Sequence, residues 1–232
     1  MEVDEALETR RSVRAFQNRP VPRATLEHIL SVASRAPSGT NMQPWRVFVV
    51  AGETKAAITR DALALHDGGP ELREPEYPYY PEEFPPEYKA RRREVGWEMY
   101  GLIGIERGDR EKMHRQHAEN FRFFGAPVGL FFFVDRVLEI GSWLDHGMFV
   151  HGVMIAARGQ GLHTCPQAAW PPFHKAVRRH LPVGEDEVLV CGMAIGWEDE
   201  GAPINALRTK RRPVGEFATF VDFGDSGDSA GS

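Results

Sequence analysis

The feature that most constrains the fold is an uninterrupted apolar run, VGLFFFV, at residues 128–134. The run is far shorter than the roughly 20 apolar residues that a membrane-spanning helix needs. A strand without polar alternation is buried on both faces, so the run predicts a central strand covered on each side by other elements. A second, largely apolar stretch at residues 187–195 predicts another buried strand.

Helical periodicity accounts for much of the remaining chain. Leu26, Ile29, Leu30 and Ala33 share one face of a helix predicted for residues 22–35. Further helices are predicted at residues 54–65, 88–103, 109–124, 145–160 and 172–180, and further strands at 45–50, 162–165 and 217–223. Because helices and strands do not alternate as regular βαβ units, the predicted fold class is α+β.

Two segments suggest how the chain is organised beyond these elements. The helix at 145–160 is apolar almost all round, which predicts burial on most sides, with a second subunit as one candidate cover. Residues 66–87 hold six prolines and three tyrosines and therefore form neither helix nor strand. A loop of this length is a functional lid or is disordered, and the interleaved aromatic residues favour an ordered arm. Residues 1–223 are predicted to form a single domain, and the Gly-, Ser- and Asp-rich residues 224–232 a disordered tail.

Composition and charge exclude several classes of protein. A formal net charge of -5 argues against a nucleic-acid binder, although residues 89–93 and 208–212 are locally basic. Those cations are candidates for the 2′-phosphate of NADPH or for an acidic substrate. The N-terminus, MEVDE, is acidic where a secretory signal is basic and then apolar. We therefore expect a cytoplasmic protein that binds neither membrane nor nucleic acid.

The cysteines and histidines do not indicate a metal site. Cys165 and Cys191 are too few for a disulfide framework and lack metal-ligand spacing. His163 and His174 do not complete a zinc pattern with Cys165, so no metal is expected.

Two polar segments are candidates for ligand binding. Arg10, Arg11, Ser12 and Arg14 concentrate three cations and a hydroxyl in five residues. Arginine pairs with phosphate oxygens bidentately, although a solvated basic surface would look the same. The second segment, APSGTNMQPW at residues 36–45, joins a helix to a strand through small residues and hydrogen-bonding side chains. Small residues let a ligand approach the backbone, and amides offer both donors and acceptors.

Four segments together resemble the FMN-dependent nitroreductase family. They are RRSVRAF at 10–16, APSGTNMQPW at 36–45, GLHTCPQAAW at 161–170 and INALRTKRRPVGEF at 204–217, in that order along almost the whole chain. Within the family the chain is most similar to nitrobenzoate-type reductases, through RRREVGWEMYGLIGIERGDR, FFGAPVGL and TCPQAAW. The resemblance implies a nitroreductase-like fold with a central mixed or antiparallel sheet flanked by helices. It also implies an interlocked homodimer with FMN at the subunit interface.

The resemblance further implies which residues contact the flavin. One subunit would supply Arg10, Ser12 and Arg14, with Arg14 near N1 and the C2 carbonyl, where a cation stabilises the anionic reduced flavin. The partner would supply Pro37, Ser38, Gly39 and Asn41. Pro166, Gln167, Ala168 and Ala169 would lie beside the ring, with a backbone N–H directed at N5. Relatives have Glu-Gly where this chain has Ala168-Ala169, so only backbone roles carry over. Arg208 and Arg211 would hold the phosphate, with Arg10 and Arg11 as further cations, although some relatives have lysine where this chain has Thr209.

The implied activity is transfer of two electrons from NADPH or NADH, through the flavin, to a small nitroaromatic acceptor. No catalytic side chain is expected, because the flavin carries the chemistry. Two alternatives stay open at this point. One is the same chemistry on a quinone, an enone or a halogenated phenol, and the other is flavin binding without useful turnover.

Overall fold

The apolar run at 128–134 forms β2 (Val128–Asp135), an inner strand of a four-stranded sheet in the order β1-β2-β4-β3. The computed structural model describes residues 1–223, and the predicted disordered tail at 224–232 lies outside them. All three pairings between neighbouring strands are antiparallel, with Phe131 of β2 opposite Phe48 of β1 and Gly192 of β4. The other strands are β1 (Arg46–Ala51), β3 (His163–Gln167) and β4 (Glu187–Gly196).

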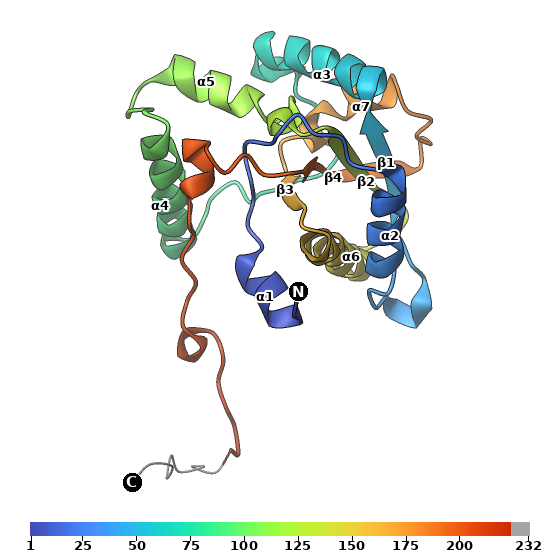
Figure 1. The fold of residues 1–232 in the computed structure, drawn as a ribbon, viewed down its shortest axis with the longest axis vertical. Coiled ribbons are helices and arrows are strands. Elements are labelled where there is room, and N and C mark those ends of the chain that lie inside the picture. The colour runs from blue at the N-terminus through green and yellow to red at the C-terminus, as the bar shows by residue number, and fades with distance from the viewer. Residues whose placement is uncertain (224–232) are drawn as a thin grey trace.

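Helices cover both faces of this sheet, as the burial of β2 requires (Figure 1). Phe131 and Phe133 are fully buried in a core with residues of α3 (Gly52–Asp67) and α7 (His174–Arg178). Leu130 and Phe132 point the other way, into a second core with α2 (Arg23–Ala33) and α6 (Ile140–Gly159). Successive side chains of a strand alternate between faces, so one apolar run supplies both cores. The α+β fold class is confirmed, with a sheet whose strand pairings are antiparallel.

Most predicted elements form close to their expected bounds. The helix expected at 88–103 is α4 (Pro86–Leu102), and the helix expected at 145–160 begins five residues earlier, as α6. Gly161, with φ of +72°, ends α6 in the left-handed conformation that glycine tolerates. The prediction for 172–180 becomes a 3₁₀ turn followed by the short helix α7.

Three predictions of secondary structure were wrong or incomplete. α1 (Val3–Thr9) was not predicted, since it buries only Ala6 and has no apolar periodicity. α5 (Arg110–Ala118) ends six residues short of the predicted end, where the chain turns into a 3₁₀ segment with Phe123 and Phe124 at positive φ. Residues 217–223 form no strand, because the chain leaves the body there and has no neighbouring strand to pair with (Figure 1).

The proline-rich arm at 66–87 is ordered and packs on the body. Within it the structure has the end of α3 and a single 3₁₀ turn, Pro70–Leu72, before α4 begins at Pro86. Glu76 and Tyr77 anchor its middle: the Tyr77 hydroxyl donates to the Val190 carbonyl at 2.8 Å, and its ring packs edge-on against Trp143 of α6. The middle of the arm therefore packs on the body.

None of the helices described in residues 1–223 combines the length and the apolar character needed to cross a membrane.

Candidate functional site

Cations from the two ends of the chain meet in one hollow. Arg10 and Arg11 follow α1, and Arg208 and Arg211 follow the 3₁₀ turn Pro203–Ala206; together they line a cavity of about 670 Å³. The lining is completed by Leu7, Glu8, Thr9 and Thr209. Small-molecule sites fall between about 300 and 1,000 Å³, so the hollow has the size of a cofactor site. The structure thus brings together residues that lie roughly two hundred positions apart in the sequence.

The positive charge of the hollow is poorly balanced by protein carboxylates. Within residues 1–223, no carboxylate forms an ion pair with Arg10, Arg208 or Arg211. Burial, and then the nearby charge of Arg211, lower the pKa of Arg10 below its ordinary value. Neighbouring guanidinium groups without acidic partners repel each other, so the arrangement favours a bound anion.

Backbone pairing fixes the first of these segments to the sheet. Ser12 forms an isolated parallel bridge with Thr164 of β3, and the Val13 amide donates to the Thr164 carbonyl at 3.1 Å. On the other side, the Arg14 amide donates to Oδ1 of Asn205 at 2.7 Å, and Nδ2 of Asn205 donates to the Ala15 carbonyl at 2.8 Å.

The buried Asn205 therefore ties the N-terminal cation segment to the segment that carries Arg208 and Arg211. Sequence reasoning did not single out Asn205. The feature of the sequence that could have identified Asn205 is its amide side chain within the motif INALRT, shortly before the predicted phosphate-binding arginines.

Arg11 has a different environment from the other three cations. Its guanidinium donates to both carboxylate oxygens of Glu198, with 2.6 Å to Oε2, and the Glu198 side chain is only 6% exposed. Nε2 of His163 lies 3.3 Å from the same carboxylate, and burial, followed by the charges of Arg158 and Arg11, lowers the pKa of His163 to about 4. Arg11 thus stabilises the fold, while its buried Nε has no hydrogen-bond partner in the described chain. Its role as a cofactor ligand stays a prediction.

The predicted ring-contacting residues lie at the end of β3 and directly after it. Pro166, Ala168 and Ala169 are half-buried. The buried Gln167 uses its side chain inside the protein, since Nε2 donates to the Asn120 carbonyl at 2.5 Å and Oε1 accepts from Trp170 at 3.3 Å. Only the backbone of Gln167 is left to contact a ligand.

The loop with Pro37, Ser38, Gly39 and Asn41 is strained and exposed. Thr40, Asn41 and Gln43 have positive φ angles of 49°, 61° and 53°. Positive φ is uncommon for residues other than glycine, and especially so for a β-branched one. The loop is held by the Gly39 amide, which donates to Oδ2 of the buried Asp145 at 2.9 Å, and by Ser38 Oγ, which accepts from the Gln43 amide at 3.0 Å. Strained loops of this kind cluster at ligand sites.

This loop does not join the cation hollow within one chain. Figure 1 shows α6 between α1, which leads into the hollow, and α2, which leads into the loop, and α6 contacts both helices. On one subunit the loop at 37–41 therefore forms a group separate from the cation hollow.

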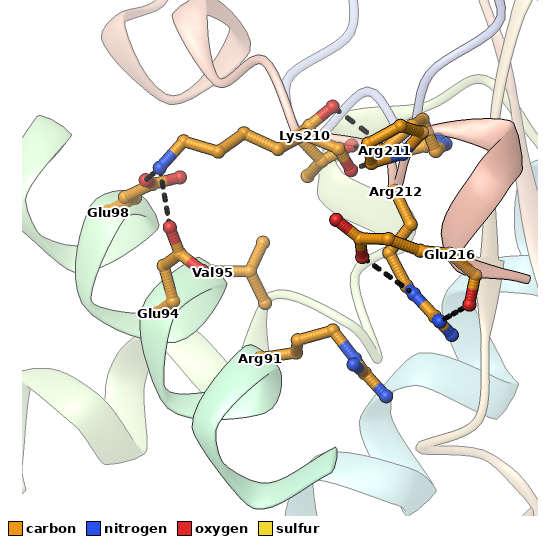
Figure 2. Close-up of a pocket in the computed structure, with 10 residues that line it drawn as sticks. Arg91, Glu94, Val95, Glu98, Lys210, Arg211, Arg212 and Glu216 are labelled. Carbon is orange, nitrogen blue, oxygen red and sulfur yellow. Dashed lines mark hydrogen bonds and ion pairs between the residues drawn. The ribbon is translucent and has the colours of Figure 1, made fainter. Parts of the chain in front are cut away.

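A second, smaller hollow of about 250 Å³ lies between α4 and residues 209–216. Figure 2 shows Lys210 reaching across to α4, where Nζ lies 2.5 Å from Glu94 and 3.7 Å from Glu98. Arg212 points instead towards Glu216, with 3.2 Å between Nε and Oε2. The neighbours of Arg211 are thus held by carboxylates on either side, while Arg211 itself lines the larger hollow.

The residues of the larger hollow fit the phosphate end of FMN. A phosphate monoester carries close to two negative charges, and arginine forks match its oxygens. Within residues 1–223, the hollow supplies three guanidinium groups without ion-pair partners, and Arg11 adds a fourth positive charge.

Residues 7–197 match the model of the Nitroreductase family. Curated relatives include a chloronitrobenzene nitroreductase from Comamonas testosteroni, 39% identical over 94% of this chain and 96% of the relative. They also include a 4-nitrobenzoate reductase from Pseudomonas putida, 37% identical over 95% of this chain and 96% of the relative.

Among solved structures, the FMN and NADPH-dependent nitroreductase NfnB from Sphigopyxis sp. strain HMH superposes with a TM-score of 0.93. It is 40% identical and covers 96% of this chain and 100% of its own. NfnB from Mycobacterium smegmatis, solved with NADPH, gives a TM-score of 0.89 at 30% identity, covering 94% of this chain and 97% of its own.

Proposed function

The chain belongs to the nitroreductase family, and from this premise we propose that it binds FMN and transfers electrons from NADPH or NADH to nitroaromatic-type acceptors. The observation that carries the proposal is the hollow where Arg10, Arg208 and Arg211 meet without carboxylate partners among the residues that the structure describes. Relatives named for nitro reduction span nearly the whole chain, and the solved structures similar to it include FMN-dependent enzymes.

Arg10, Arg208 and Arg211 hold the phosphate of FMN in this proposal, and Arg11 adds its positive charge. Arginine is suited to this task because each guanidinium offers several N–H donors in a fixed plane. Ser12 and Arg14 lie in the segment that Thr164 and Asn205 hold in place. The half-buried Pro166, Ala168 and Ala169, with the backbone of Gln167, line the flavin ring.

When bound, FMN would supply the two-electron redox chemistry between the nicotinamide and the acceptor. The protein's own residues bind and orient the cofactor, and no nucleophile or metal is required of them. Arg14 contributes a fixed positive charge, with Nη1 donating to the Ser12 carbonyl at 3.2 Å. Ala168 and Ala169 have no polar side-chain atoms, so the backbone is the part of this loop that can form hydrogen bonds.

The site is completed, we infer, by a second copy of the chain. Pro37, Ser38, Gly39 and Asn41 are separated from the hollow by α6 within one subunit, so a partner would supply them (Figure 1). Large apolar side chains are exposed on α6, where Ile140 is 86% and Leu144 68% exposed. They are also exposed on the segment that leaves the body, where Phe217 is 64% and Phe223 76% exposed. Exposed apolar patches of this kind mark interfaces between proteins.

Purification and anaerobic reduction test this function. The protein should purify yellow, and heat should release one FMN per chain, identified by chromatography. Under argon, NADPH or NADH should bleach the flavin within the mixing time, and a nitrobenzoate should restore the yellow colour. Release of FAD, or absence of any flavin uptake, would contradict the cofactor assignment. Slow or absent bleaching would instead identify a flavin carrier, and light scattering would show whether the active species is a dimer.

A further inference from the structure

A cluster of three histidines and one aspartate lies outside the cation hollow. His66 and Asp67 form the last turn of α3, while His114 and His117 lie three residues apart on α5. Figure 1 shows both helices on the same side of the sheet. Among residues 1–223, one group of potential metal ligands is found: His66, Asp67 and His114, with one ligand atom from each within 4.8 Å of the others.

The carboxylate of Asp67 is the centre of this cluster. Its Oδ1 lies 3.2 Å from Nδ1 of His66 and 2.9 Å from Nε2 of His114. Ligands of a tetrahedral zinc ion with bonds of about 2.0–2.1 Å are on the order of 3.3 Å apart. The two distances from Asp67 are therefore close to those that one metal ion would impose, and the two histidine nitrogens lie within 4.8 Å of each other.

The surroundings of the cluster also suit a cation. The carbonyl end of α3, a helix of 16 residues, carries partial negative charge. His66 is only 2% exposed, whereas the side chains of Asp67 and His114 are 66% and 46% exposed, so an ion can enter from solvent. The positive charge of Arg73, which helps to lower the pKa of His66, is the nearby feature that disfavours a bound cation.

His117 occupies the position of a supporting partner. Its Nδ1 lies 3.0 Å from Nε2 of His66, and the two rings are stacked with centroids 5.1 Å apart. A histidine that ligates through Nδ1 carries its proton on Nε2, which can then donate to His117. Metal-ligating histidines almost always donate their second ring nitrogen in this way.

We propose that His66, Asp67 and His114 bind one divalent transition-metal ion, with zinc as the best match, and so clamp the end of α3 to α5. Two imidazole nitrogens and a carboxylate oxygen are ligands that zinc favours, and three protein ligands leave a position for water. One of the ligands, His66, is also the first residue of the proline-rich arm. It acts on the stability of this region and takes no part in electron transfer.

Zinc titration of the untagged FMN-loaded protein, after chelator treatment, tests the proposal. Competition with a chromophoric zinc indicator should give one equivalent of zinc per chain. His114→Gln and Asp67→Asn change exposed side chains, so both variants should fold, retain FMN and bind zinc at least tenfold more weakly. His28→Gln changes an exposed histidine on α2 and is the matched control, with unchanged zinc affinity.

A thermal readout distinguishes the clamp from loose surface binding. Saturating zinc should raise the Tm of the wild type and of His28→Gln by a few degrees, since a ligand that binds only the folded state stabilises it. The two cluster variants should show no such rise. The proposal is overturned if the wild type takes up no stoichiometric zinc, or if both cluster variants bind zinc with wild-type affinity.

Discussion

Arg10 and Arg211 come from opposite ends of the chain and face the same hollow, where burial and then the charge of Arg211 lower the pKa of Arg10. Two cations that repel each other reduce the stability of the protein without its ligand. The same pair binds a phosphate strongly, because folding has already placed the two guanidinium groups close together before the ligand arrives. Cofactor affinity and apoprotein stability should therefore respond in opposite directions to the loss of either arginine.

Arg211→Ala should weaken FMN binding while leaving the apoprotein as stable as the wild type or more so. Removing one charged partner of a phosphate costs about 2–5 kcal/mol, roughly 30-fold or more in affinity. Flavin fluorescence titration measures the affinity, and urea unfolding of the apoprotein measures the stability. Arg212→Ala is the control, because Arg212 pairs with Glu216 outside the larger hollow. Equal flavin affinity in wild type and Arg211→Ala would place the phosphate elsewhere.

The ion pairs of Lys210 should make a small contribution to the same affinity. Lys210 contacts Glu94 and Glu98 on α4 and so restrains the residue next to Arg211 (Figure 2). Solvent screens exposed pairs of this kind, so the double change Glu94→Gln, Glu98→Gln should weaken FMN binding by at most about fivefold. Glu87→Gln on the same helix removes only a pair with Arg91 and should have no effect on the titration. A loss as large as that of Arg211→Ala would mean that α4 shapes the hollow itself.

His146 should make the fold sensitive to mild acid. Its side chain on α6 is completely buried, and burial, opposed in part by the Pro44 backbone, lowers its pKa to about 4. The folded pKa lies below the ordinary value near 6.5, so the unfolded chain takes up the proton first as the pH falls. Stability is therefore unaffected at higher pH and is lost progressively from about pH 6.5 down to about pH 4.

The variant His146→Phe should remove this part of the acid sensitivity. Between pH 7.5 and pH 5, the wild type should lose about 2 kcal/mol more unfolding free energy than the variant. The comparison across two pH values cancels any packing change that does not depend on pH. His28→Gln, at an exposed histidine, should keep the wild-type pH dependence. Parallel stability curves for wild type and His146→Phe would show that His146 does not titrate as proposed.

Local sequence patterns predicted the helices and strands that a single chain can form without a partner. The run at 128–134 predicted β2 and its two covered faces, because an apolar strand can be stable only when both faces are buried. The strand predicted at 217–223 failed for the converse reason: strand propensity needs a neighbour to pair with, and the single chain offers none there.

The candidate site was predicted only in part, because some of its contacts form only after folding. The arginine clusters were visible as charge in the sequence, and the fold brings them to one hollow. The sequence did not predict the ion pair between Arg11 and Glu198 or the hydrogen bond from Gln167 to Asn120. These contacts join residues that lie far apart in the sequence. The histidine cluster escaped notice because His66 and His114 lie on different helices and show no ligand spacing along the chain.

Glu76 should contribute far more to stability than its neighbour Glu74. The side chain of Glu76 is 9% exposed and lies 2.7 Å from Arg136, 3.2 Å from Arg178 and 3.6 Å from His174. Glu76→Gln removes the charge that these groups share and should cost about 1.5–3 kcal/mol in urea unfolding. Glu74→Gln breaks an exposed, solvent-screened pair with Lys175 and should cost much less. Equal costs for the two variants would mean that the arm is not anchored at Glu76.

The tip of the arm, residues 78–85, is where we expect an effect on substrate rather than on the fold. Beyond the anchors Glu76 and Tyr77, an aromatic chain continues through Tyr79, Tyr80 and Phe84, with ring centroids 4.7 Å and 5.7 Å apart. Tyr79 and Tyr80 are 43% and 53% exposed and so present ring surface to solvent. Offset stacking on an electron-poor nitroaromatic ring contributes about 0.5–1.5 kcal/mol beyond burial.

Replacing 78–85 with a Gly/Ser linker of equal length should therefore raise KM for a bulky nitroaromatic by about two- to tenfold. A small acceptor should be affected less, and FMN content should stay at one per chain, because the cation hollow and both anchors are retained. Replacing 70–86 would also remove Glu76 and Tyr77 and should lower stability as well. Steady-state kinetics with one large and one small acceptor, alongside flavin content, make the comparison. If both acceptors keep their KM, the tip does not contact substrate; if the linker variant loses FMN, the tip supports the cofactor site instead.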